Sequence, residues 1–177
     1  TFVSPQLERN MIVKDNFLDP LFVDILLERT LKGNMYYNGV SNSLDGLKFF
    51  QAPINLENVY AEYLCRKFMK LSDKKLGFLR AYANIQFENM DGDWHEDDGE
   101  YTFLLMISET LRSGDGCFET KNKKVDFIKN RCIMFDARET HRGLSSKFSK
   151  QPRVTLAFKS KEYNANRKIT DTTTNWG

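Results

Sequence analysis

The spacing of apolar residues changes near residue 78 of this chain. Before that point, two stretches carry apolar residues at the three- to four-residue spacing of an amphipathic helix. The first begins at Asp19-Pro20, where Asp19 suits an N-cap and Pro20 the first helical position, and it ends at Gly33-Asn34. The second runs from about residue 56 to residue 71. We therefore expect two helices in the N-terminal part of the chain.

The remaining N-terminal residues lack helical spacing. Residues 11–18 predict a short strand followed by a turn. Residues 38–55 are rich in Asn, Ser, Gly and Asp, a composition that is typical of a loop. Such a loop could close over a neighbouring site as a lid.

From residue 78 the apolar residues recur at every second position, which predicts a long strand with two different faces. The polar positions of this stretch are Arg80, Tyr82, Asn84, Gln86 and Glu88. A turn at 89–93 and further strand-like segments follow, at 101–107, 116–119, 125–128, 132–135 and 153–159. Helices first and short strands afterwards predict a mainly β fold with flanking N-terminal helices. The polar tail after Glu162 is expected to be poorly ordered.

Composition narrows the class of protein. The chain has 177 residues, of which 41% are hydrophobic and 28% are charged, as in an ordinary soluble domain. A net charge of +2 gives no sign of a nucleic-acid or membrane surface, and no apolar run reaches the roughly 18 residues of a membrane span. Cys65, Cys117 and Cys132 form no CxxC pair, so we expect buried thiols in a reducing, cytoplasmic compartment.

The only two histidines of the chain lie in its β-rich part. Asp97 follows two positions after His95, so both side chains point to one face of an extended segment. His141 follows a polar turn after the apolar stretch 132–135, where a side chain can point into the mouth of a barrel. Two imidazoles and one carboxylate suit Fe(II), with open positions for a co-substrate and O2. Each residue alone is a weak signal, so the metal hypothesis depends on all three together.

Arg153 begins an otherwise apolar, β-branched segment. An unpaired guanidinium is costly to bury, so Arg153 needs an acid as partner. That acid is either a carboxylate of the protein or a bound dicarboxylate. Thr155 lies two positions further, on the same strand face, and could donate its hydroxyl to the same carboxylate.

Several short motifs in this region resemble one enzyme family. They are Trp-His-Glu-Asp at 94–97, Gly-Asp-Gly-Cys-Phe-Glu at 114–119, Asn-Arg-Cys-Ile-Met-Phe-Asp at 130–136, His141, and Arg-Val-Thr at 153–155. Together they are similar to the Fe(II)/2-oxoglutarate-dependent dioxygenases, in the prolyl-4-hydroxylase-like branch. The resemblance implies a double-stranded β-helix (jelly-roll, cupin-like) core at about 78–160. A helical part at about 1–75 would precede this core and a tail at 161–177 would follow it, in one dioxygenase domain spanning 1–177.

The resemblance also implies roles for individual residues. His95, Asp97 and His141 would be the iron ligands and the catalytic centre. Arg153 would bind the distal carboxylate of 2-oxoglutarate, and Thr155 matches the hydroxyl of an Arg-x-Ser/Thr motif. Fe(II), 2-oxoglutarate and O2 would be required, with ascorbate as a further candidate cofactor.

Two departures from the family pattern concern the co-substrate pocket. Many prolyl hydroxylases have Lys where this chain has Arg153, and the Tyr often found on the strand before the metal motif is replaced by Gln86. Tyr82, Asn84 and Gln86 share one strand face. They either line the 2-oxoglutarate pocket or belong to a solvated strand face.

Four functions remain open at this point. The first is hydroxylation of an unactivated C–H bond in a prolyl or other residue of a protein or peptide, with decarboxylation of 2-oxoglutarate to succinate. The second is the same chemistry on a free small molecule, and the third is a non-catalytic cupin-like metal-binding protein. The fourth, nucleic-acid dealkylation, is disfavoured because a run of basic residues such as the one that would support it is typical of a solvated turn. These residues are Lys121, Lys123, Lys124, Lys129 and Arg131. The sequence gives no indication of the oligomeric state.

Overall fold

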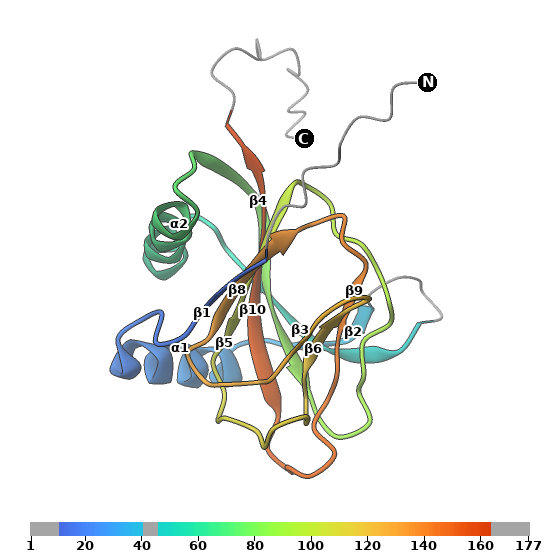
Figure 1. Ribbon diagram of the computed structural model, residues 1–177. Coiled ribbons are helices and arrows are strands. Elements are labelled where there is room, and N and C mark those ends of the chain that lie inside the picture. The colour runs from blue at the N-terminus through green and yellow to red at the C-terminus, as the bar shows by residue number, and fades with distance from the viewer. Residues whose placement is uncertain (1–10, 41–45, 164–177) are drawn as a thin grey trace, which may run out of the picture.

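The computed structural model describes residues 11–40 and 46–163 (Figure 1). The predicted tail beyond residue 163 and the middle of the 38–55 segment therefore lie outside the described residues. Within the described part, no helix is long and apolar enough to cross a membrane.

Two antiparallel sheets form most of the structure, which confirms the mainly β prediction. The seven-stranded sheet has the order β1-β8-β5-β10-β4-β3-β2. Its strands are β1 Ile12–Lys14, β8 Cys132–Asp136, β5 Tyr101–Met106, β10 Arg153–Glu162, β4 Leu76–Gln86, β3 Lys48–Ile54 and β2 Tyr36–Val40. The three-stranded sheet has the order β7-β6-β9, with β7 Lys124–Val125, β6 Phe118–Thr120 and β9 His141–Gly143.

Two helices are present where helical spacing predicts them. Helix α1 (Pro20–Lys32) begins after Asp19, whose side chain accepts hydrogen bonds from the backbone amides of Leu21 and Phe22 at 3.0 and 3.3 Å. Helix α2 (Val59–Ser72) begins three residues later than predicted, because the side chain of Asn58 caps it by accepting from the amide of Tyr60 at 2.9 Å.

The helices and the small sheet lie on opposite sides of the large sheet (Figure 1). Buried residues of α1 and α2, such as Leu26 and Phe68, form one apolar cluster with Ala83 of β4 and Leu156 of β10. A second cluster joins the other face of the large sheet to β6 of the small sheet. The two clusters account for the period-two pattern, because alternate residues of β4 and β10 face the helices or the space between the sheets.

The face of the large sheet that looks toward the small sheet carries the unusual polar residues. In β10 they are Arg153, Thr155 and Lys159, which pair in register with Gln86, Asn84 and Arg80 of β4. Antiparallel pairing thus aligns the polar positions of two distant segments over one face. The expectation that Tyr82, Asn84 and Gln86 share a strand face is confirmed by this register.

Some predicted boundaries are wrong. Residues 38–40 and 48–54, within the segment 38–55 that we expected to be a loop, belong to strands β2 and β3. Strand β3 forms because it pairs with β4, with Phe50 opposite Ile85 and Ala52 opposite Ala83, and local composition does not report such long-range pairing. In the small sheet, β6 overlaps the predicted segment 116–119 only at 118–119, and β7 overlaps the predicted segment 125–128 only at residue 125. Strand β10 continues to Glu162, into the segment predicted as tail.

Candidate metal and co-substrate site

Backbone pairing brings His95 and His141 together. The amide of each residue donates to the carbonyl of the other, at 3.0 and 2.9 Å, although His95 lies outside the regular strands. The amide of Asp97 donates to the carbonyl of Ala137 at 2.7 Å and fixes the segment against the chain that leads into β9. Gly99 has a φ of +97°, and a Cβ there would lie 2.7 Å from the carbonyl oxygen of Ser160. Glycine therefore allows this segment to pass closely over β10.

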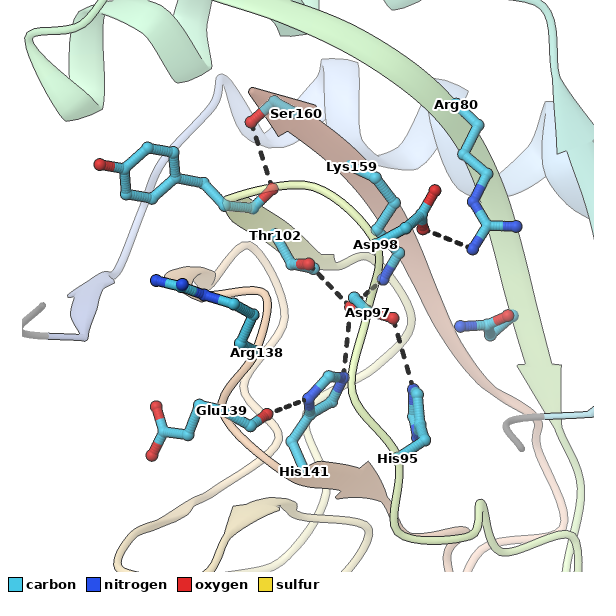
Figure 2. A network of polar contacts seen from close by, with 12 residues as sticks. Arg80, His95, Asp97, Asp98, Thr102, Arg138, Glu139, His141, Lys159 and Ser160 are labelled. Atoms are coloured by element: carbon cyan, nitrogen blue, oxygen red, sulfur yellow. Dashed lines mark hydrogen bonds and ion pairs between the residues drawn. The ribbon is translucent and has the colours of Figure 1, made fainter. Parts of the chain in front are cut away.

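The three predicted ligands form one cluster (Figure 2). Their candidate ligand atoms all lie within 4.8 Å of one another. Nε2 of His95 lies 3.5 Å from one carboxylate oxygen of Asp97, and Nε2 of His141 lies 3.3 Å from the other. The structure thus brings together His95, Asp97 and His141 in the arrangement that a shared cation requires.

The other nitrogen of each imidazole is already engaged. Nδ1 of His95 lies 2.8 Å from the carbonyl oxygen of Asp93. Nδ1 of His141 lies 2.7 Å from that of Glu139 (Figure 2). A carbonyl only accepts, so Nδ1 donates and Nε2 is left to face Asp97. A cation, either a proton on the ring or a metal ion, then has to lie between Nε2 and the carboxylate. The donor set and its backbone support therefore fit a divalent metal.

Asp97 has two further partners that the sequence did not suggest. Its Oδ2 accepts a hydrogen bond from Oγ1 of Thr102 at 2.7 Å and forms an ion pair with Nζ of Lys159. Burial alone would raise the pKa of the Asp97 carboxyl. The hydrogen bonds with His141 and His95 and the charge of Lys159 outweigh burial and hold that pKa well below its usual range. Asp97 is therefore ionised and anchored through one oxygen. We call His95, Asp97, Thr102, His141 and Lys159 the metal end.

Arg153 lies at the other side of the same face, buried as predicted, and no carboxylate of the described residues pairs with it. Its Nε donates to the carbonyl of Gly116 at 2.8 Å and its Nη1 to Oε1 of Gln86 at 2.6 Å. Its Nη2 has no hydrogen-bond partner among the described residues. Burial lowers the pKa of Arg153 to about 10, because its neutral partners do not compensate the loss of water. Of the two partners expected from the sequence, the protein carboxylate is therefore absent within the described residues.

A second unpartnered group lies beside this arginine. Oγ1 of Thr155 is buried and has no hydrogen-bond partner within the described part of the chain. Gln86 is also buried, and its amide donates to the carbonyls of Met90 and Gly143, which turns its oxygen toward Arg153. The alternative of a solvated strand face is thus wrong for Gln86. We call Gln86, Arg153 and Thr155 the carboxylate end.

One cavity of about 150 Å³ connects the two ends. All eight predicted site residues line it, and Lys159 and Thr102 line it as well. Asn84 lies between the ends, and its side-chain oxygen accepts a hydrogen bond from the side-chain amide of Gln51 at 3.1 Å. Phe118 and Phe135 form apolar walls and contact the ring of His141, with centroids 5.6 and 4.6 Å away. The position of Lys159 could have been predicted from the sequence, because counting every second residue from Arg153 places Lys159 on the same strand face.

The fold is shared with known 2-oxoglutarate oxygenases. A viral collagen prolyl hydroxylase from Paramecium Bursaria Chlorella virus-1, in complex with 2-oxoglutarate, superposes with a TM-score of 0.65 at 15% identity, covering 85% of this chain and 94% of that one. A Trichoplax adhaerens prolyl hydroxylase, in complex with a peptide fragment of the hypoxia inducible factor oxygen degradation domain, gives 0.65 at 16% identity, with coverage of 85% and 82%. HygX from Streptomyces hygroscopicus, with nickel, 2-oxoglutarate and hygromycin B bound, gives 0.65 at 10%, with coverage of 84% and 81%.

These likenesses confirm the predicted resemblance at the level of the fold: the chain has the jelly-roll fold of the 2-oxoglutarate/Fe(II) oxygenases. Neither a protein-family model nor a curated protein matches the sequence. The activity therefore has to be argued from the site.

Proposed function

We propose that the protein is an Fe(II)- and 2-oxoglutarate-dependent dioxygenase that hydroxylates an unactivated C–H bond, with a residue of a protein or peptide as substrate. One observation carries the proposal. Within the described residues, a single cavity joins a three-residue cluster of candidate metal ligands to the buried Nη2 of Arg153 and the buried hydroxyl of Thr155, neither of which has a hydrogen-bond partner. A dicarboxylate that chelates the metal with one end and meets Arg153 with the other satisfies both features at once.

The metal end fits Fe(II) by its chemistry. Neutral imidazole nitrogens and one carboxylate are the ligand set of the facial triad, which leaves three octahedral positions open. The carbonyls of Asp93 and Glu139 orient the two rings through their Nδ1 atoms, and such outer contacts maintain metal affinity. His95, Asp97 and His141 would hold the ion.

The carboxylate end fits the distal carboxylate of 2-oxoglutarate. Nη2 of Arg153 and Oγ1 of Thr155 are both donors that the described part of the chain leaves unused, and a carboxylate accepts from both. Gln86 holds the guanidinium in place from the opposite side through Nη1. Tyr82 and Asn84 line the cavity between the ends and would contact the body of the co-substrate.

Iron held by His95, Asp97 and His141 would, with 2-oxoglutarate and O2, supply the oxidation that converts 2-oxoglutarate to succinate and CO2 and hydroxylates the substrate. The protein's own residues bind and orient the reactants. Arg153 and Thr155 fix the co-substrate, and the Nδ1 hydrogen bonds fix the two imidazoles. Phe118 and Phe135 exclude water beside His141.

Two of the structurally similar proteins hold ligands that bear on the substrate. The Trichoplax prolyl hydroxylase binds a peptide fragment, which supports a peptide substrate here. HygX holds hygromycin B, so a free small molecule is the second candidate. The basic residues considered for nucleic acid are largely neutralised, since Lys124, Lys129 and Arg131 pair with Glu119, Glu109 and Asp15. This pairing favours the first two substrate classes.

The test is release of succinate from 2-oxoglutarate by the full chain with Fe(II) and O2, measured with panels of prolyl-containing peptides and small hydroxylatable molecules. We expect succinate from the wild type, increased by a substrate, and none from Arg153→Met or His141→Ala. A protein that binds metal normally but never forms succinate with any member of the panels would support the non-catalytic cupin-like alternative.

A further inference from the structure

Lys159 is a buried cation directly beside the proposed metal site. Its side chain is only 3% exposed and pairs with Oδ2 of Asp97, whose carboxylate is also 3% exposed (Figure 2). Nζ also lies 5.4 Å from the ring centroid of Tyr82. Asp97 is the one carboxylate that pairs with Lys159 within the described residues. A single carboxylate therefore serves both an ammonium and the proposed metal ion.

The buried charges of the cavity do not balance. Asp97 contributes one negative charge, and Lys159 and Arg153 contribute two positive ones. Arg80 and Glu96 also line the cavity, but both are exposed, with Arg80 56% exposed and paired with Asp98. The interior thus carries one net positive charge, which a divalent ion raises to three and a dicarboxylate then lowers to one. Each step changes the interaction energy with Lys159 in a low-dielectric environment.

We propose that Lys159 sets the balance between the two ligands, weakening the binding of the metal alone and strengthening the binding of the dicarboxylate to the metal-loaded site. This inference rests on the proposed function. The positive charge of Lys159 repels a divalent ion held by Asp97 and attracts a dianion bound to that ion. A residue that only orients Asp97 would have a different effect, because its loss would weaken metal binding.

Thr102 is the matched control that separates charge from orientation. Its hydroxyl donates to the same Oδ2 of Asp97 at 2.7 Å, but it carries no charge. Thr102→Val removes the hydrogen bond that orients Asp97 and leaves the charges of the site unchanged, so it should weaken metal binding. Lys159→Met removes the charge from a side chain of similar length, so it should strengthen metal binding.

The experiment is calorimetric titration of the metal-free full chain with Mn(II), followed by titration of the Mn(II)-loaded protein with 2-oxoglutarate. For Lys159→Met we expect Mn(II) to bind roughly tenfold tighter and 2-oxoglutarate roughly tenfold weaker than for the wild type. Arg80→Met, which removes an exposed cation from the same cavity, should change both affinities by less than about threefold because solvent screens that charge.

Lys159→Gln guards against failure of the methionine variant to fold. Glutamine keeps a hydrogen-bond donor for Asp97 and removes the charge, so the same two opposite changes are expected. Unchanged or weaker Mn(II) binding in folded Lys159 variants would overturn the inference, as would unchanged binding of 2-oxoglutarate. Failure of the proposed function looks different: the wild type would bind no Mn(II), or His141→Ala would bind it equally well.

Discussion

The two ends of the cavity differ in whether their buried polar groups have hydrogen-bond partners. At the metal end, Asp97 has partners in Thr102, Lys159 and both histidines. At the carboxylate end, Nη2 of Arg153 and Oγ1 of Thr155 have none among the described residues. Buried polar groups in folded proteins are almost always satisfied, and an exception calls for a ligand. The more conspicuous sequence signal, the histidine pair, is therefore the less decisive evidence for a ligand, and the arginine is the more decisive one.

Replacing a ligand at the metal end should have the largest effect. His141→Ala removes one of three proposed metal donors, and loss of even outer-sphere partners costs about 10- to 100-fold in affinity. We expect Mn(II) to bind more than about 100-fold more weakly, as measured by calorimetry, with His95→Ala as the parallel variant. Unchanged Mn(II) affinity in both variants would mean that the cluster is a hydrogen-bond network without a metal.

Arg153→Met tests the carboxylate end at a somewhat smaller magnitude. A charge-assisted hydrogen bond contributes about 1.5–3 kcal/mol, so loss of the guanidinium should weaken 2-oxoglutarate binding to the Mn(II)-loaded protein by up to about 100-fold. Binding of Mn(II) alone should not weaken, because Arg153 makes no contact with the cluster. If Mn(II) affinity fell as much as 2-oxoglutarate affinity, the two ends would not be separate in function.

Two threonines sharpen the comparison, because the same substitution can be made at each end. Thr102 and Thr155 are 1% and 0% exposed, and among the described residues Thr102 has a hydrogen-bond partner whereas Thr155 has none. Thr102→Val should lower the free energy of unfolding of the ligand-free protein by about 1.5–3 kcal/mol, since it breaks a bond to a charged group. Thr155→Val should leave it unchanged or raise it, because the substitution removes a buried hydroxyl that has no partner in the ligand-free protein.

The order should reverse for the co-substrate. Thr155→Val removes a donor that we assign to the distal carboxylate, so 2-oxoglutarate should bind about fivefold more weakly. Thr102→Val should leave this affinity closer to that of the wild type once Mn(II) is saturating. Chemical denaturation and calorimetry on both variants measure the two quantities. Equal destabilisation by both substitutions would contradict the contrast between the ends.

The smallest expected effect concerns Gly143, which packs against the guanidinium. A Cβ at this position would lie 3.2 Å from Nη1 and 3.3 Å from Nη2 of Arg153. Gly143→Ala should displace the flexible side chain of Arg153 by a few tenths of an ångström and weaken the binding of 2-oxoglutarate roughly two- to threefold. Mn(II) affinity should stay constant. Gly77→Ala, at a position with no atom within 4 Å of an added Cβ, is the control and should change neither affinity.

Much of the site could be predicted from the sequence because its residues obey local rules. Period two placed Asp97 beside His95 and Thr155 beside Arg153, and helix caps fixed the start of α1. What could not be predicted depends on pairing over long distances. Strand β3 owes its structure to β4, and the partner of Lys159 lies 62 residues away in the chain. The lack of a carboxylate partner for Arg153 among the described residues is also non-local, because only the folded chain reveals it.

The most direct test of the account is an anaerobic titration of the protein with Fe(II) and then 2-oxoglutarate, followed by visible absorption. We predict a charge-transfer band for the wild type, because the co-substrate would chelate iron at the metal end while Arg153 holds its distal carboxylate. The band should be absent from His141→Ala and from Arg153→Met at 2-oxoglutarate concentrations that saturate the wild type. Absence of the band from a wild-type protein that binds Fe(II) normally would contradict the central claim that the two ends form one co-substrate site.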